Sequence, residues 1–254
     1  MSGRGSLAVV GLGPGAAEWL TPEVFAALAQ ASDIVGYAPY LARLPLRAGQ
    51  KLHASDNRAE ILRARHALEL ACDGHDVAVV SGGDPGVFAM AAAVFEAVES
   101  GPAQWRGLDI RVMPGISAMM AAAARLGAPL GHDFCAISLS DNLKPWPVIE
   151  RRLAAAIAGD FVIALYNPAS KARPDRIHDA FAILRAGKAD ATPVALARAV
   201  GRADERIVLG ELGTIDLAVI DMSTLVIIGS SETRFVLRDK GRPWLLTPRS
   251  YGAV

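Results

Sequence analysis

The 254-residue sequence has few cysteines and no excess of charge of either sign, and each of these shortages disfavours a common class of protein. Its two cysteines, Cys72 and Cys135, lie in apolar runs and form no CxxC pair, which argues against a zinc site, an iron–sulfur cluster or a disulfide scaffold. We therefore expect no bound metal and interpret both cysteines as small core residues. Basic and acidic residues both total 26, so the formal net charge is zero, and no global basic field attracts nucleic acid.

Long apolar runs are also missing. No run approaches the ~18 residues of a membrane span, and the opening MSGRGSLAVVGLGPG lacks the basic segment, apolar core and cleavage site of a signal peptide. We therefore expect a cytoplasmic protein without a membrane or nucleic-acid partner. Apolar residues nevertheless make up 52% of the chain, with 20% charged residues and no low-complexity tract, a composition typical of a chain that buries a full core.

Short runs rich in valine and isoleucine recur along the chain. They are LAVVGL, VAVVSG, DIRVM, FCAISL, FVIALY, PVALA, RIVLGEL and TLVIIG, and such runs are typical of buried parallel strands. Between them, apolar residues follow helical spacing in four sets: Val24, Leu28 and Ala31; Val87, Ala91, Val94 and Val98; Ile149, Leu153 and Ile157; Ile177, Phe181 and Leu184. This alternation predicts an open α/β sheet.

Glycine- and proline-containing breaks and helix-capping residues indicate where these elements begin and end. The break GAPLGHD, residues 127–133, predicts a domain junction, giving an N-terminal α/β domain over 1–126 and a C-terminal α/β domain over 127–254. The connections between PVALA, RIVLGEL and TLVIIG are too short for crossover helices, which predicts antiparallel pairing and a mixed second sheet. Thr21 before Pro22 and Asp84 before Pro85 each predict a helix N-cap followed by proline at the first helical position.

The segment GLGPGA, residues 11–16, directly follows LAVV and formally matches the GxGxxG/A dinucleotide fingerprint. In a dinucleotide site the glycine turn opens straight into a helix, and an acidic residue ends the second strand. Here Pro14 interrupts the turn, the expected helix starts only near Thr21, and Asp33 precedes its apolar neighbours instead of following them. The pattern disfavours a nicotinamide cofactor, although a glycine-rich loop still lets a ligand approach the backbone closely.

Two further loops follow predicted strands. SGGDPG, residues 81–86, comes after VAVV, and MPGISA, residues 113–118, ends the run DIRVM. Each has a structural alternative, since Asp84 and Ser117 are also common helix caps. The carboxyl ends of parallel strands share one edge of a sheet, however, and ligands bind there. Three such loops therefore predict a ligand site at this edge.

The strings GLGPG, SGGDPGVF and PGISA, in this order and at these distances, resemble the tetrapyrrole methylase superfamily over nearly the whole chain. VGYAPYL, GHDFCAISLSDNLKPW and ALYNPASKARP resemble more specifically its members that methylate precorrin-3B at C17 and contract the macrocycle to precorrin-4 in cobalamin biosynthesis. The anaerobic relatives that act on cobalt-factor III are not separated from these by the strings, and another tetrapyrrole methylase also stays open.

This resemblance implies two α/β domains with S-adenosylmethionine and the substrate in a cleft between them. It also implies a homodimer and S-adenosylhomocysteine as product. The cofactor contacts that it implies in the first domain are Pro14, Gly82, Gly83, Asp84, Val87, Ser117 and Ala118. In the second domain they are Tyr166, Asn167, Ala197 and Thr224.

The implied reaction sets demands on the remaining site residues. Methyl transfer from a sulfonium needs mainly alignment, whereas ring contraction needs a hydroxyl to lose a proton, and so a general base. The segment after FCAISL lies where substrate-facing groups belong, although a solvated turn is the alternative. The predicted catalytic residues are Asp141, Asp84 and Lys144, the neighbouring substrate-binding residues are Ser140 and Asn142, and His132 is a further proton carrier or a structural residue.

The macrocycle carries acetate and propionate carboxylates, so the site needs guanidinium or ammonium groups despite the zero net charge. Cations that follow predicted strand ends are the candidates: Arg43, Lys171, Arg173, Arg198 and Arg202. Each is otherwise an ordinary surface charge. Tyr37 and Tyr40 either stack on a ring edge or are core aromatics.

Three other classes of function compete with this hypothesis. A different methylase of the superfamily would keep the glycine loops and change the methylated carbon. A nicotinamide reductase would need an acidic residue at the end of the second strand, whereas Asp33 precedes its apolar residues. A noncatalytic carrier would bind cofactor or corrinoid without turnover.

Overall fold

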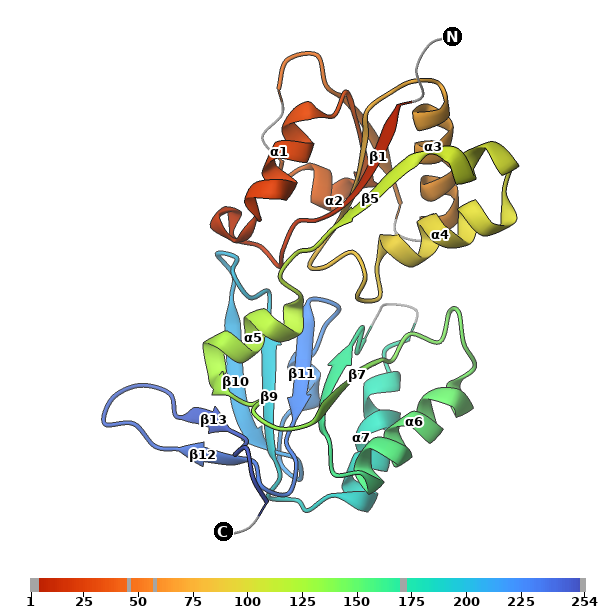
Figure 1. Cartoon of the computed structure of the whole chain (residues 1–254). Coiled ribbons are helices and arrows are strands. Elements are labelled where there is room, and N and C mark those ends of the chain that lie inside the picture. The colour runs from red at the N-terminus through yellow and green to blue at the C-terminus, as the bar shows by residue number, and fades with distance from the viewer. Residues whose placement is uncertain (1–4, 45–46, 57–58, 170–172, 252–254) are drawn as a thin grey trace. The chain divides into compact units, whose positions relative to one another are not determined.

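The computed structural model describes residues 5–44, 47–56, 59–169 and 173–251 (Figure 1). The chain separates into two compact units, Met1–Ala118 and Met119–Val254. The division falls at the start of helix α5 (Ala118–Leu126), whereas the break in the sequence pattern follows this helix. Within the second unit, Arg125 of α5 forms an ion pair with Glu205 at 3.2 Å.

The first unit is built on a five-stranded sheet in the order β3-β2-β4-β1-β5, in which every pairing is parallel. Because the strands run in one direction, their carboxyl ends share one edge and their amino ends the other. The strands are β1 (Ser6–Gly11), β2 (Asp33–Tyr37), β3 (Lys51–Ser55), β4 (Val77–Ser81) and β5 (Asp109–Met113).

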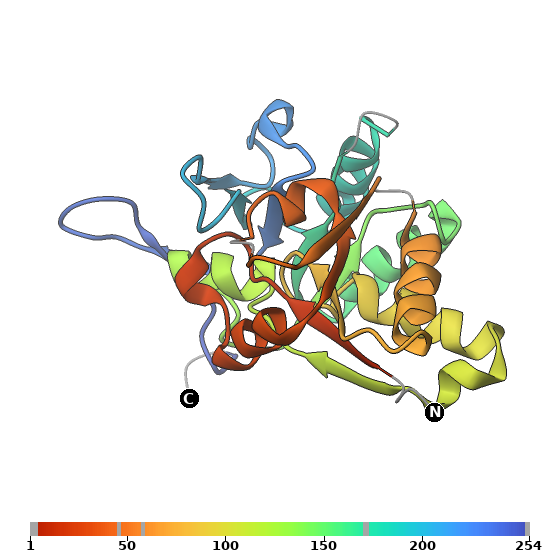
Figure 2. The same ribbon diagram turned by 90° about the horizontal axis from the view of Figure 1, so that it is seen from above.

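Helices cover both faces of this first sheet, because successive strand residues point to opposite sides. Val9 packs toward α3 (Glu60–Cys72), α4 (Met90–Ser100) and the short helix η2 (Ala103–Gly107), whereas Val10 packs toward α1 (Pro22–Gln30) and α2 (Ala38–Leu41). Figure 2 shows α3 and α4 side by side, as their contacts also indicate. One turn, η1 (Ala17–Trp19), precedes α1.

The second unit has a mixed five-stranded sheet in the order β10-β9-β11-β8-β7. Only the β7–β8 pairing is parallel, so the predicted antiparallel pairing of the last three runs is confirmed. Helices α6 (Trp146–Ala158) and α7 (Arg176–Gly187) pack side by side, with Leu153 and Phe181 fully buried against the sheet. The strands are β7 (Phe134–Ser138), β8 (Val162–Tyr166), β9 (Pro193–Arg198), β10 (Arg206–Glu211) and β11 (Thr224–Ile228).

A small sheet completes the second unit. Its order is β12-β13-β6, from Arg234–Val236, Trp244–Leu246 and Gly127–Ala128. The loop between β12 and β13 projects from the rest of this unit (Figures 1 and 2). A short helix, η3 (Leu217–Val219), lies before β11. In the part of the chain that is described, no helix is both long and apolar enough to cross a membrane.

All eight apolar runs form strands, and one of the two predicted helix caps is confirmed. Thr21 accepts a hydrogen bond from the Val24 amide at 3.2 Å, with Pro22 at the first helical position. The prediction for Asp84 is wrong, because α4 begins only at Met90. The carboxylate of Asp84 is engaged elsewhere, and Phe88 adopts a positive φ of 53° that interrupts helical geometry.

Candidate functional site

Three loops meet at the carboxyl edge of the first sheet. They follow β1, β4 and β5, and the first two are joined by backbone hydrogen bonds. The Leu12 amide donates to Ser81 O at 2.8 Å, and Gly13 and Gly83 exchange bonds of 3.1 and 2.8 Å. The meeting of the loops that the sequence predicted is therefore present within this unit.

Glycines permit this close approach. A Cβ on Gly11 would lie 2.6 Å from Gly83 O and 2.7 Å from the Gly115 amide nitrogen, both of them backbone atoms. Gly13 and Gly83 have positive φ angles of 66° and 72°, which disfavour other residues. These glycines thus hold the three loops together, and their role in packing precedes any role toward a ligand.

Asp84 fastens two of these loops. Its Oδ1 accepts a hydrogen bond from the Gly86 amide at 2.8 Å and its Oδ2 accepts one from the Gly115 amide at 3.0 Å. Both carboxylate oxygens are therefore engaged with the backbone. This geometry suits a residue that shapes the loops better than it suits a free general base.

All the predicted cofactor residues of the first unit belong to these loops or to the residue that follows them. Next to Gly83, the nearest atom to an added Cβ would be Ser117 Cα at 3.7 Å, whereas a Cβ on Gly82 would lie 2.8 Å from the Tyr40 ring. The loop after β4 thus has one glycine covered by an aromatic ring and one at which an added Cβ would meet only ordinary van der Waals contacts. Glycines in such a loop let a ligand approach the backbone closely. The seven residues are Pro14, Gly82, Gly83, Asp84, Val87, Ser117 and Ala118.

In the second unit the predicted residues also lie at one edge of the sheet. The carboxyl ends of β7, β8 and β9 share this edge with the amino end of β11. Tyr166 ends β8, and its hydroxyl accepts a hydrogen bond from the Met119 amide at 3.1 Å. Asn167 follows in the left-handed region, with φ of 52°, and donates from Nδ2 to Ser138 Oγ at 3.0 Å. Ala197 is buried near the end of β9, and Thr224 opens β11.

Asp141 is held by two arginines. Its oxygens accept hydrogen bonds from Arg173 at 3.0 Å and from Arg176 at 2.8 Å, and its side chain is 16% exposed. Partial burial alone would raise the pKa of Asp141, but the hydrogen bonds from Arg176 and Arg173 outweigh it and hold this pKa below its ordinary value. A carboxylate stabilised in this way is a weaker base than the sequence suggested.

Arg176 was not predicted from the sequence. It bridges Asp141 and Asp179, at 2.8 and 3.0 Å, and its guanidinium lies 4.6 Å from the centre of the Trp146 ring. The sequence signal that could have identified Arg176 is its position in the first turn of a helix, three residues after Arg173.

Lys144 lies in the same loop after β7. Burial, and secondarily the charge of Arg152, lower the pKa of Lys144. Nearby, Ser140 donates its amide to Ser138 Oγ at 3.3 Å, while Asn142 is exposed. The environment of Lys144 therefore shifts its amine toward the neutral, basic form.

The other predicted cations have varied surroundings. Arg198 is bound by Asp204 at 2.7 Å and by Asp221 at 2.8 Å, and Asp221 also accepts a hydrogen bond from the Thr224 hydroxyl. Arg202 is exposed in the loop after β9. Arg43 lies 5.3 Å from the centre of the Tyr40 ring, which forms an edge contact with Tyr37. Lys171 lies outside the described residues.

His132 and Asp33 both lie away from the ligand edges of the two sheets. His132 precedes β7 and so lies at the amino end of this strand, whereas Asp141 follows its carboxyl end. The centres of the His132 and Tyr251 rings are 4.9 Å apart. Asp33 opens β2, so it lies at the amino edge of the first sheet, opposite the glycine loops, and it is buried against His53 and His75. It therefore does not serve as the ribose-binding carboxylate that a nicotinamide site requires.

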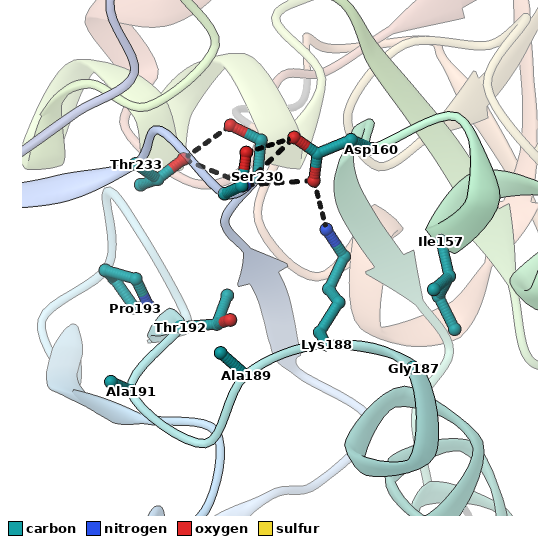
Figure 3. A pocket seen from close by; sticks show the side chains of 11 residues that line it. Ile157, Asp160, Gly187, Lys188, Ala189, Ala191, Thr192, Pro193, Ser230 and Thr233 are labelled. Atoms are coloured by element: carbon teal, nitrogen blue, oxygen red, sulfur yellow. Dashed lines mark hydrogen bonds and ion pairs between the residues drawn. The ribbon is translucent and has the colours of Figure 1, made fainter. Parts of the chain in front are cut away.

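A hollow of about 290 Å³ lies at the opposite edge of the second sheet and contains none of the predicted site residues (Figure 3). At its wall, Asp160 accepts hydrogen bonds from the Ser231 hydroxyl at 2.6 Å and the Tyr251 hydroxyl at 2.8 Å, and pairs with Lys188 at 3.2 Å. These contacts join α6, α7 and the last segment of the chain. We interpret this cluster as structural.

Similarity to known proteins agrees with this geometry. The family model of the Tetrapyrrole (Corrin/Porphyrin) Methylases matches residues 6–216. The chain belongs to this family. Over 251 residues, this tetrapyrrole methylase is 58% identical to a precorrin-3B C(17)-methyltransferase of Sinorhizobium sp, covering 98% of both chains. Over 246 residues it is 43% identical to a probable cobalt-factor III C(17)-methyltransferase of Salmonella typhimurium, covering 96% of this methylase and 99% of the relative.

Solved structures are similar as well. The methyltransferase CobJ matches this methylase with a TM-score of 0.91 and 51% identity, over 96% of this chain and 100% of that chain. A uroporphyrin-III C-methyltransferase from Thermus thermophilus, crystallised with S-adenosylhomocysteine, has a TM-score of 0.65 at 21% identity and covers 89% of this chain and 97% of its own. The second likeness shows the shared fold, and the two α/β units are those of this family.

Proposed function

We propose that this methylase transfers a methyl group from S-adenosylmethionine to C17 of precorrin-3B and couples this step to ring contraction, giving precorrin-4 in cobalamin biosynthesis. The observation that carries the proposal is the 58% identity to a precorrin-3B C(17)-methyltransferase over 98% of both chains. The two ligand edges support it, because the predicted residues collect at one edge of each sheet.

S-adenosylmethionine, when bound, supplies an electrophilic methyl group on a sulfonium. The loops after β1, β4 and β5 suit this group, since their glycines bring three stretches of backbone together at the ligand edge of the sheet and let a ligand approach the main chain closely. We propose that these loops, with Tyr166, Asn167, Ala197 and Thr224 of the second unit, hold the cofactor. Alignment of the acceptor carbon is then the main contribution of the protein to methyl transfer.

Ring contraction requires a proton to leave a hydroxyl of the substrate. We propose Lys144 as the base, because burial lowers its pKa and so increases the fraction of free amine. Asp141 is proposed as a positioning residue that fixes Arg173 and Arg176 at 3.0 and 2.8 Å, so that these guanidiniums face substrate carboxylates in a defined orientation. Asp84 is proposed to shape the cofactor loops.

The alternative substrate is cobalt-factor III, because the Salmonella relative, a probable cobalt-factor III C(17)-methyltransferase, is 43% identical to this chain. The higher identity to the precorrin-3B relative favours the metal-free macrocycle. Purified protein should be incubated with methyl-labelled S-adenosylmethionine and each substrate in turn, and the product analysed by NMR. Label at C17 of a contracted ring from precorrin-3B supports the proposal, whereas label at another carbon, or turnover of cobalt-factor III alone, contradicts it.

The same incubation separates the other classes of function. A carrier protein would retain the macrocycle without labelling it in a single turnover, and a reductase would oxidise a nicotinamide cofactor. We further propose that the enzyme is a cytoplasmic homodimer, since closed two-fold symmetry is the commonest assembly. Light scattering over a range of concentrations tests the assembly, and a monomer at every concentration would contradict it.

A further inference from the structure

Arg63 is a buried cation at the ligand edge of the first sheet. It lies on the inner face of α3, where Ala64, Ala67 and Leu68 are fully buried, and only 5% of its surface is exposed. Its Nε donates to Ser55 Oγ at 2.7 Å and its Nη2 to Asp56 O at 2.6 Å. Ser55 is the last residue of β3, so these bonds place the guanidinium at the carboxyl end of the strands.

The same guanidinium reaches the loop that follows β4. Its Nη1 lies 3.2 Å from the sulfur of Met90, the first residue of α4, and the Met90 amide donates to Ser81 Oγ at 3.2 Å. Tyr40 and Tyr37 also lie near enough to influence the pKa of Arg63. Arg63 therefore lies among the ends of β2, β3 and β4, beside the glycine loop.

This positive charge has no direct counter-charge in the described structure. None of the described carboxylates forms an ion pair with Arg63, and its three partners are a hydroxyl, a carbonyl and a thioether. Burial lowers the pKa of Arg63, and the charges of Glu60 and Asp56, both exposed residues, offset this only in part. The positive end of the α4 dipole is close by and adds to the unfavourable potential.

A buried charge without a counter-charge is costly, and a bound ligand of opposite charge offsets this cost. We propose that Arg63 forms an anion subsite that binds one side-chain carboxylate of the macrocyclic substrate through the N–H groups that the described residues leave unused. The proposal rests on the proposed function, because the substrate of that reaction is a polycarboxylate. A guanidinium at a sheet edge is suited to this task, since it binds a carboxylate with two parallel hydrogen bonds.

The stability of the free protein distinguishes this role from a structural one. Arg63→Met removes a buried charge that has no carboxylate partner, which favours the variant, and loses the hydrogen bonds to Ser55 and Asp56, which disfavours it. We therefore expect Arg63→Met to unfold within about 4 °C of the wild type, with cofactor affinity, measured by calorimetry, changed less than about twofold. Arg65, exposed on the same helix, provides the matched control Arg65→Met.

Substrate binding should weaken. Arg63→Met should raise the KM for precorrin-3B about tenfold or more, with little change in kcat, and Arg63→Lys should fall in between. Arg65→Met should behave as the wild type. An unchanged KM in Arg63→Met, an equal rise in Arg65→Met, or a lower unfolding temperature together with lost cofactor affinity would overturn the proposal.

A binding probe keeps this test independent of the reaction. Uroporphyrin III, a stable tetrapyrrole octacarboxylate, and its fully esterified form can be titrated by tryptophan fluorescence into wild type, Arg63→Met and Arg65→Met. Weaker binding of the acid to Arg63→Met alone, with the ester unaffected, supports the anion subsite. Equal binding of the acid to all three proteins overturns it. If the wild type fails to methylate precorrin-3B, the proposed function falls, and this titration still decides the role of Arg63.

Discussion

Asp33 links three elements at the amino edge of the first sheet, and its charge should contribute measurably to stability. The side chain is 2% exposed and accepts hydrogen bonds from His53 Nε2 and His75 Nδ1, both at 2.7 Å, and from Ser32 Oγ at 2.8 Å. His66 in turn lies 2.9 Å from His53. Burial alone would raise the pKa of Asp33, but these hydrogen bonds outweigh it and lower the pKa from 3.8 to about 2.

The magnitude follows from this shift. Because the pKa is lower in the folded state than in the unfolded chain, the stabilisation is fully present above pH ~4 and is lost as the pH falls toward 2. A shift of nearly two pKa units corresponds to about 2–3 kcal/mol at pH 7, roughly half of this at pH 3 and only a small part of it at pH 2. Asp33→Asn keeps the size of the side chain and removes its charge, so it should lose this free energy of unfolding.

Urea unfolding at pH 7 and pH 3 tests the reasoning. Trp105 is buried in the first unit and reports on it by fluorescence when Trp19, Trp146 and Trp244 are replaced by Phe. Asp76→Asn, at an exposed position near the same edge, is the control and should change the free energy of unfolding by less than about 0.5 kcal/mol. A deficit in Asp33→Asn that is the same at pH 7 and pH 3 would refute an origin in the charge of Asp33.

Three further predictions concern the loops, the catalytic groups and a helix cap. Gly11→Ala places a Cβ 2.6 Å from Gly83 O, so we expect the free energy of unfolding to fall by about 1–3 kcal/mol. Cofactor binding, measured by calorimetry, should also weaken. Wild-type values for both quantities would show that the loops adapt to the added Cβ. Lys144→Met should leave a methylated, ring-intact product detectable by mass spectrometry and NMR, whereas Asp141→Asn should mainly raise KM; accumulation of that product in Asp141→Asn instead would make Asp141 the base. Thr21→Ala removes the cap of α1 and should cost about 1 kcal/mol in urea unfolding, and no loss would mean that the hydroxyl bond is not formed in solution.

The sequence by itself determined most of the elements and the positions where ligand groups gather. Runs such as VAVV and TLVIIG form strands because their apolar side chains are buried on both faces of a sheet. The short connections in the last part of the chain fixed antiparallel pairing. In the first sheet, strands β2 and β3 are not among the predicted runs. The KLHAS sequence of β3 lies at a sheet edge with exposed residues and carries no apolar pattern.

Only the tertiary structure decided which partner each polar group finds. Asp84 resembles a helix cap in the sequence, yet its carboxylate binds the amide of Gly115, 31 residues away, because parallel strands bring their carboxyl ends together. Asp141 resembles a base, yet Arg173 and Arg176 surround it and lower its pKa. Arg63 resembles an ordinary helix charge, although its spacing from Ala67 was a signal that it faces inward. Hydrogen bonds and ion pairs between distant segments depend on the folded arrangement, so local pattern identifies these side chains and the fold assigns their chemistry.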